Sequence, residues 1–393
     1  GRDAGRSEYT NFGANVLFSP TEDIELEYTF VIERTDQDTP PLLNVGQPGQ
    51  LFCDAFGYCA PDIHTPITGD RYTVSMDDVG LDKATFDADT HIIEARWDIN
   101  DDFKFNYIFG SWKTSETIRG DWDGTPELLF HTDRPGDYAQ TSHEVRLAYD
   151  ADGPFSGVLG AYLWDSNYEA RLRSYIGFAI PNVVLDLPQT TNQTTDSWAI
   201  FFEGDYAISD ALKLTLGARF SRDEKTTDQV GIVNAAADHS WKKFTPKVAL
   251  TYDVSDDAMV YASYSQGYRS GGFNGRVDDK VTAETPYNEE VVDNFEAGFK
   301  STLLDNTLRL NGAVFVMKYK DKQEEIQLPS LTSGTGQVTL VANASTATIK
   351  GIELDAQFVP MAGLSIRANL GLLKTEYDTF VFDGGMGLVD YSH

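Results

Sequence analysis

Apolar and polar residues alternate with a period of two along much of this sequence. In segment 24–33 (IELEYTFVIE) apolar side chains occupy the even positions, and polar or charged side chains occupy most of the odd positions. Because successive side chains of a β-strand point to opposite faces, this pattern predicts a strand with one apolar and one charged face. The pattern recurs in segments 144–149, 212–220, 295–300 and 364–370.

Short turn sequences separate the predicted strands into pairs. They are rich in Asp, Asn, Gly, Pro and Ser, and they lie at 19–23, 100–102, 151–154, 209–210, 255–257, 305–306 and 360–363. Long connections lie between them, at about 34–86, 115–138, 169–194, 224–240, 270–288 and 323–347. We therefore predict about 14 antiparallel strands in seven hairpins, with the long connections on one face and the short turns on the other.

A transmembrane β-barrel explains this pattern better than a β-sandwich does. Many predicted strands run for roughly 11 to 16 residues, whereas sandwich strands are usually about 5 or 6 residues long. A packed sandwich core also cannot accept a charged inner face, because buried unpaired charges are costly. Five tryptophans near predicted strand ends fit the aromatic girdles of an outer-membrane barrel: Trp97, Trp112, Trp164, Trp198 and Trp241.

The composition favours a single all-β architecture throughout. Aromatic residues make up 12% of the 393 residues, whereas Cys and Met are scarce, and no change in composition marks a linker. No apolar run reaches the roughly 18 residues of a membrane-spanning helix, and the first ten residues lack the features of a signal peptide. The mean hydropathy of −0.33 is still compatible with membrane strands, which need only alternating apolar residues.

The strongly acidic balance limits the possible partners. The net charge is −30, so a nucleic-acid partner, which requires a basic surface, is excluded. A solvated exterior accounts for this charge, and cation binding in the loops is the functional alternative.

The two cysteines, Cys53 and Cys59, lie close together in a Gly- and Pro-containing stretch. This spacing predicts a disulfide that stiffens a loop in an oxidising compartment. A metal pair is the weaker interpretation, because there is no second cysteine pair and the nearest histidine is His64.

Several segments together resemble the barrel domain of TonB-dependent outer-membrane receptors, from Tyr9 to about Phe380. They include FFEGDYAISDALKLTLGARFSRDEK, FTPKVALTYDVSDDAMVYASYSQGYRSGGFN and YNEEVVDNFEAGFKSTLLDNTLRLNGAVFVMKYKDKQ. The resemblance implies a bacterial outer-membrane barrel of 22 strands with short periplasmic turns and long extracellular loops. It also implies an N-terminal plug domain and coupling to the energising TonB complex. Lipid, lipopolysaccharide and a nutrient ligand would be its other partners. We expect residues 1–393 to form part of one barrel domain without a plug, with strands missing before Tyr9 and after Phe380.

No catalytic arrangement of residues is evident, so we expect neither an enzyme nor a cofactor. The six histidines show no pair at ligand spacing, and Asp121-Trp122-Asp123-Gly124 resembles a calcium loop only faintly, because the later ligands are missing. An acidic turn is the preferred interpretation, and no metal site is predicted.

The Gly-rich segment GYRSGGFNGR is the main candidate for ligand binding. Its aromatic, amide and guanidinium groups suit a polar ligand with anionic or carbonyl oxygens: Tyr268, Arg269, Phe273, Asn274 and Arg276. A mobile loop whose glycines satisfy turns is the alternative. Weaker candidates in other long connections are Arg171, Arg173, Tyr175, Trp122 and Tyr58.

Charged residues on the inner faces of the predicted strands are expected to form ion pairs on the lumen wall. They are Glu94, Arg96, Glu144, Arg146, Glu203, Arg219, Glu296, Lys300, Glu353 and Arg367. The leading functional hypothesis is active transport of a scarce nutrient such as a siderophore, a cobalamin-like compound or a saccharide. A passive porin-like channel or structural surface barrel is the alternative, and a secreted all-β binding protein is a third.

Overall fold

The computed structural model describes residues 5–39, 42–62, 64–67, 69, 83–180, 183–329, 337–383, 388–390 and 392. His393 and parts of the predicted connections 34–86 and 323–347 lie outside these residues. The described chain forms one antiparallel sheet of 15 strands, in which each strand pairs with its neighbours in sequence. The strands are β1 (Ser7–Thr21), β2 (Ile24–Gln37), β3 (Ala84–Asp98), β4 (Phe103–Asp121), β5 (Phe130–Asp150), β6 (Phe155–Ile180), β7 (Val183–Ser209), β8 (Leu212–Gly231), β9 (Ala235–Ser255), β10 (Ala258–Arg269), β11 (Glu290–Leu303), β12 (Leu308–Pro329), β13 (Gln337–Met361), β14 (Leu364–Asp383) and β15 (Leu388–Asp390).

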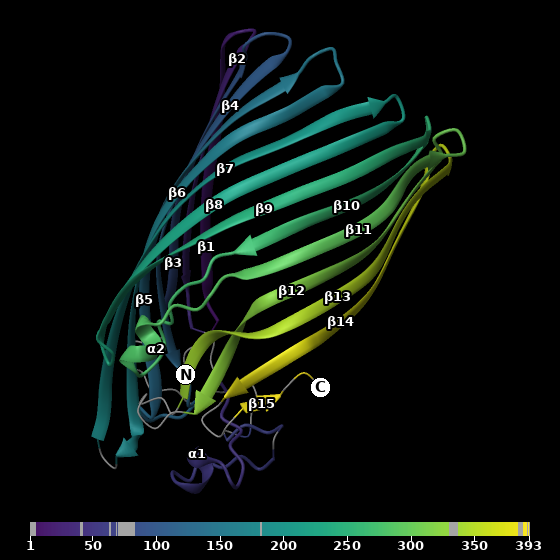
Figure 1. Cartoon of the computed structure of the whole chain (residues 1–393). Helices are drawn as coiled ribbons and strands as arrows, with labels where there is room; N and C mark the ends of the chain where they lie inside the picture. The colour runs from purple at the N-terminus through teal and green to yellow at the C-terminus, as the bar shows by residue number, and fades with distance from the viewer. Residues whose placement is uncertain are drawn as a thin grey trace.

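The sheet is a tilted, curved wall with two different ends (Figure 1). Short turns join the strands at one end, which we call the turn end. The short helices α1 (Leu51–Asp54) and α2 (Lys280–Glu284) lie at the opposite end, which we call the loop end. This arrangement confirms the predicted all-β meander and the predicted separation of the connections into two ends. Among the described residues, no helix is long and apolar enough to cross a membrane.

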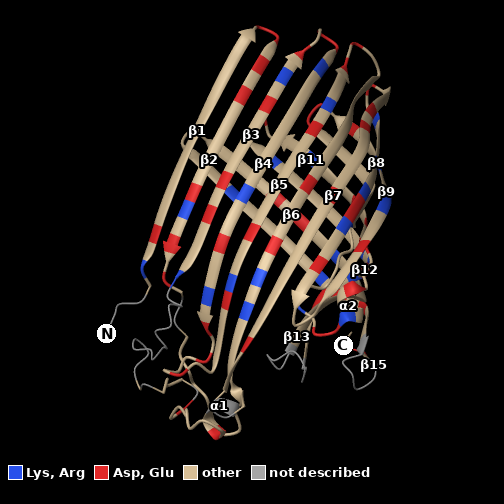
Figure 2. Cartoon of the chain, turned by 90° about the vertical axis from the view of Figure 1, so that its left-hand side faces the viewer, with Lys and Arg blue, Asp and Glu red and all other residues tan. Residues whose placement is uncertain are grey.

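The two faces of the sheet differ as the alternation predicts. Outward residues such as Leu163, Ile200 and Phe244 are apolar and more than half exposed, and together they form what we call the apolar band. Charged residues recur as red and blue bands along the strands (Figure 2), and several of them pair on the opposite, lumen face. There Arg96 contacts Glu27 at 3.0 Å and Glu94 at 2.7 Å, and Lys247 contacts Glu203 at 2.9 Å. The expected ion pairs on the lumen face are confirmed for these residues.

The tryptophans divide between the two faces. Trp97 opposite Phe105 and Trp198 opposite Leu163 lie on the outward face, at the two borders of the apolar band. The girdle interpretation, which rested on the set of five rather than on any single tryptophan, does not extend to the other three. Trp112, Trp164 and Trp241 pair with Gln140, Ser142 and Asp223, which lie on the lumen face. Aromatic residues suit both a lipid border and a packed lumen wall, so residue type alone did not identify the face.

Several of the predicted long connections are strands. β6 has 26 residues and β7 has 27, whereas a strand needs only about 9–11 residues to cross a membrane. The predicted connections 115–138, 169–194, 224–240 and 323–347 are therefore largely the far ends of β4–β9, β12 and β13. Beyond the apolar band both faces are polar, as in the TTNQTTD segment of β7, so the alternation that marks a strand is missing.

Candidate functional site

A long segment without strands, residues 270–289 between β10 and β11, packs against the lumen face at the loop end. Val277 and Ala283 are buried in one apolar cluster with Val233 of the turn between β8 and β9, Ala235 of β9 and Leu340 of β13. Asp279 caps the short helix α2 by accepting a hydrogen bond from the Thr282 N–H. The segment is therefore fixed in place by neighbouring strands.

Hydrogen bonds and a close backbone approach also hold this segment. Lys225 Nζ donates to the Gly271 carbonyl at 2.6 Å, and Gln229 Nε2 donates to the Asn274 carbonyl at 2.9 Å. A Cβ atom at Gly271 would lie only 2.0 Å from the Tyr287 carbonyl oxygen and 2.6 Å from the Trp241 ring, so the close approach requires glycine. The glycines thus permit a tightly packed segment, which differs from the alternative of a mobile loop.

Phe273 and Asn274 anchor the segment to the sheet. Phe273 is buried and meets the Trp241 ring edge-on, with the ring centroids 6.3 Å apart. Asn274 forms a reciprocal pair with the backbone of β13: its Nδ2 donates to the Val341 carbonyl at 3.1 Å, and its Oδ1 accepts from the Val341 N–H at 2.7 Å. The sequence placed both residues in the ligand set, and the structure engages both in docking the segment.

A cavity of about 400 Å³ opens on the lumen side between segment 270–289 and the far ends of β4–β7, β12 and β13. Arg276 enters it from the segment, and Arg134 of β5 and Tyr168 of β6 enter it from the wall. The charges of Glu116, Arg276 and Arg134 all act on the Tyr168 hydroxyl. Arg276 also lies 3.9 Å from Glu325. The cavity thus combines two guanidinium groups, one phenol and two carboxylates.

The other predicted ligand residues lie apart from this set. Arg171 takes part in the lining of the cavity, but its guanidinium contacts Asp137 at 2.6 Å and Glu169 at 3.2 Å. These three residues occupy odd positions, on the face opposite Arg134 and Tyr168. Arg173 lies on that same outward face and forms a two-bond ion pair with Asp186.

Tyr268 and Arg269 end strand β10, next to the cavity but outside its lining. Tyr268 is half-buried near Asp223 of β8, and Arg269 is exposed opposite Glu290 of β11. Among the predicted ligand residues, Phe273, Asn274, Arg276 and Arg171 therefore come together at this cavity, and of these four only Arg276 directs a charged group into it.

The sequence interpretation missed Arg134, Tyr168 and the amides of Gln189 and Gln193, which complete the cavity. Arg134, Gln189 and Gln193 lie in segments that were predicted to be loops, and Tyr168 directly precedes one of them, so no face was assigned to these residues. The strand parity carried the missing signal: Tyr162, Trp164 and Tyr168 all occupy even positions of β6, and the first two already face the lumen.

The loop that the disulfide closes also lies at the loop end, outside the lining of the cavity. Cys53 and Cys59 form a disulfide within the segment between β2 and β3 that carries α1. Asn44 joins this segment to the tip of β4 through a 2.8 Å hydrogen bond to the Asp123 carbonyl.

Comparison with known proteins identifies the family. Residues 13–390 match the family model described as TonB dependent receptor-like, beta-barrel. The chain is 26% identical over 283 residues to the pesticin receptor of Yersinia pestis, a match that covers 70% of this chain and 39% of the relative. It is 23% identical over 332 residues to the ferric-pyoverdine 358 receptor of Pseudomonas putida, covering 78% of this chain and 38% of that protein. The chain thus spans about two fifths of these curated relatives.

Solved structures agree on the fold. The ferric yersiniabactin uptake receptor FyuA from Yersinia pestis superposes with a TM-score of 0.74 at 18% identity, over 97% of this chain and 58% of that one. The copper transporter OprC superposes with a TM-score of 0.70 at 14% identity, over 95% and 54% of the two chains. The family match, which covers nearly the whole chain, confirms both the resemblance and the predicted location: this chain belongs to the TonB-dependent receptor-like β-barrel family of the bacterial outer membrane.

Proposed function

We propose that this chain forms the lumen wall of a receptor that takes up a scarce nutrient in the form of an anionic metal chelate of the siderophore type. The observation that carries this proposal is the cavity at the loop end, into which Arg134, Arg276 and Tyr168 project from three separate parts of the chain. The family resemblance implies extracellular loops, so we place the loop end toward the exterior and the cavity where a ligand first enters the barrel.

The donor set suits oxygen-rich anions. A guanidinium group presents several N–H donors in a plane and binds carboxylate-type oxygens with two parallel hydrogen bonds. At 3.9 Å the contact between Arg276 and Glu325 is an ion pair without a hydrogen bond, so it positions the charge while leaving the N–H donors available. The Tyr168 ring adds a flat surface for the organic part of a chelate.

The names of the relatives support the same substrate class. They describe receptors for ferric pyoverdine and ferric yersiniabactin, and the solved structure of the second shares the barrel fold of this chain. We propose that uptake is energised by the TonB complex acting through a plug domain of the receptor, as the family name implies.

The experiment is uptake of radioactive iron, supplied as a ferric siderophore, by cells whose only ferric-siderophore receptor contains this chain. We expect saturable uptake that stops when a proton uncoupler collapses the inner-membrane potential. Uptake that continues unchanged with the uncoupler would contradict the proposal and favour the passive channel.

A matched pair of variants connects uptake to the cavity. Arg276→Ala is expected to raise the ligand concentration needed for half-maximal uptake, whereas Arg173→Ala is expected to leave it unchanged, because Arg173 lies on the outward face. An equal effect of the two changes would remove the cavity from the proposal.

A further inference from the structure

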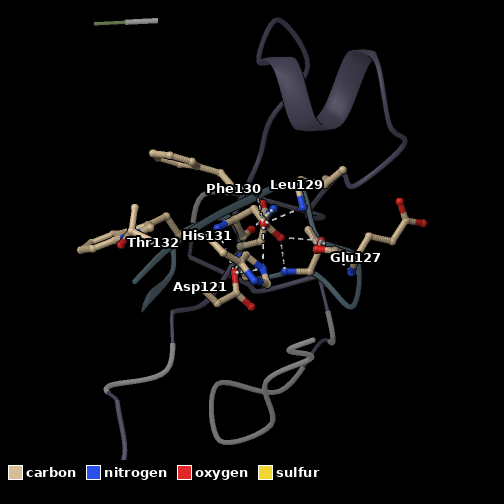
Figure 3. Close-up of polar contacts among 11 residues, drawn as sticks. Asp121, Glu127, Leu129, Phe130, His131 and Thr132 are labelled. Atoms are coloured by element: carbon tan, nitrogen blue, oxygen red, sulfur yellow. Dashed lines mark hydrogen bonds and ion pairs between the residues drawn. The ribbon is translucent and has the colours of Figure 1, made fainter. Parts of the chain in front are cut away.

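A buried group of two carboxylates and one imidazole lies at the tip of the β4–β5 hairpin, outside the cavity. Asp121 ends β4 and His131 is the second residue of β5 (Figure 3). Asp123 lies in the turn that connects the two strands. His131 is fully buried, and the two aspartates are each only 3% exposed. Their candidate ligand atoms all lie within 4.8 Å of one another. Burial raises the pKa of Asp121, because its ionised form loses hydration.

Polar atoms in this group lack hydrogen-bond partners. Neither ring nitrogen of His131 has one, and neither does Oδ2 of Asp121. Buried polar atoms without partners are rare in folded proteins and require an explanation, such as a bound ion. Nε2 of His131 faces both carboxylates, at 3.5 Å from Asp121 Oδ1 and 3.4 Å from Asp123 Oδ2.

These separations match the edge of a metal coordination tetrahedron. A zinc ion bound to nitrogen and oxygen at about 2.0–2.1 Å places its ligand atoms about 3.3 Å apart. One imidazole nitrogen with two carboxylates suits divalent transition metals, whereas calcium and magnesium prefer oxygen ligands alone. Three protein ligands leave a fourth position for water.

Backbone donors hold the carboxylates in this orientation. The Phe130 N–H donates to Asp123 Oδ2 at 2.6 Å, and the Thr125 N–H donates to Asp123 Oδ1 at 3.0 Å. The Gly124 N–H donates to Asp121 Oδ1 at 2.9 Å. Such outer-shell hydrogen bonds orient metal ligands and limit the loss of side-chain freedom on binding.

We propose that Asp121, Asp123 and His131 bind one divalent transition-metal ion of the zinc type. The bound ion would cross-link the two sides of the β4–β5 hairpin at its tip. Thr132 and Arg134 lie on the opposite face of the same strand, and Trp122 Nε1 donates to Thr132 Oγ1 at 2.7 Å there. The ion therefore braces the outward side of a hairpin whose lumen side forms part of the cavity wall.

The test is zinc binding by the detergent-purified receptor after removal of metal with a chelator, with Zn²⁺ as the only added metal. We expect the wild-type receptor to bind about one more zinc ion tightly than the His131→Gln variant does. The zinc affinity of this site should fall by about 100-fold or more in the variant. Asp121→Asn, which keeps the side-chain shape, is expected to act in the same direction. His64→Gln is the matched control, because His64 is an exposed histidine of the neighbouring segment, and it should retain the wild-type affinity.

The X-ray absorption spectrum of the bound zinc is the second measurement, and it does not depend on the variants folding. It should show one imidazole nitrogen and otherwise oxygen at about 2.0–2.2 Å. No zinc uptake by the wild type, a zinc shell without imidazole, or unchanged affinity in His131→Gln would overturn the proposal.

Discussion

The apolar band and the loop-end tips are built from the same strands, yet they face different surroundings. In β7, Trp198, Ile200 and Phe202 alternate with lumen-facing residues, because one side of the wall meets lipid. Ten residues further toward the loop end, Thr190 and Thr191 are both polar, because water lies on both sides. The environment on each face of the sheet therefore determines whether apolar and polar residues alternate. The backbone hydrogen bonds between the strands continue in both regions.

The largest expected effect comes from placing a charge in the apolar band. Ile200 and Val230 are both outward residues with similar exposure, 55% and 58%, but Ile200 lies within the band and Val230 lies at the tip of β8. Ile200→Arg should destabilise the folded receptor in lipid by about 2–4 kcal/mol, and Val230→Arg by about 0–1 kcal/mol. Denaturant unfolding of the receptor in liposomes measures both. Equal costs would show that the band does not meet lipid where we place it.

A second effect separates the two faces of the tips. Arg134→Ala should weaken binding of the ferric chelate by about 1.5–3 kcal/mol, the usual contribution of a hydrogen bond to a charged group. Arg173→Ala removes an equal charge from the outward face and should change the affinity little. Titration of intrinsic fluorescence gives the dissociation constants. A larger loss for Arg173→Ala would place the ligand outside the lumen.

A third effect concerns the docking of segment 270–289. Asn274→Ala leaves the backbone N–H and carbonyl of Val341 without their partners, at a local cost of about 1–3 kcal/mol. Faster amide hydrogen exchange throughout 270–289 is the expected result. Arg269→Ala is the control, since Arg269 is exposed at the start of the segment. Exchange that remains slow after the Asn274 change would mean that the apolar cluster alone holds the segment.

The smallest effect is expected from reducing the Cys53–Cys59 disulfide. A closed loop of this size constrains the unfolded chain by about 2 kcal/mol at most. Faster exchange should be confined to the segment between β2 and β3, with no change in the strands. A fall in the unfolding temperature of the whole barrel would contradict this local role.

The strands could be predicted from the sequence where one face of the sheet meets lipid, because apolar and polar residues alternate there. They could not be predicted where water lies on both sides. Segment 212–220 was placed correctly in β8, because Leu214, Leu216 and Phe220 all face lipid. Segment 169–194 was predicted to be a loop although it pairs for most of its length, since its Thr, Asn and Gln side chains show no preferred face. No local rule marks strands of this kind.

The candidate site was predicted only in part for the same reason. Arg276 and Phe273 stood out in a Gly-rich segment, but their roles depend on where that segment docks, which is set by contacts with distant residues such as Val341. Arg134 lies in a segment without clear alternation, and Tyr168 could be placed only by extending the parity of β6 from Tyr162 and Trp164. His131 lies opposite Asp121 because of the β4–β5 register, so its approach to the two aspartates follows from strand pairing.

Photocrosslinking at two adjacent residues tests the central claim most directly. Tyr168 faces the cavity and Glu169 faces outward, so a photoreactive p-benzoylphenylalanine in place of either residue samples one side of the same strand. With a radioactive ferric siderophore bound to the receptor, we predict labelling of the protein from position 168 and little from position 169. Equal labelling from both positions, or labelling from position 169 alone, would contradict a binding site on the lumen face at the loop end.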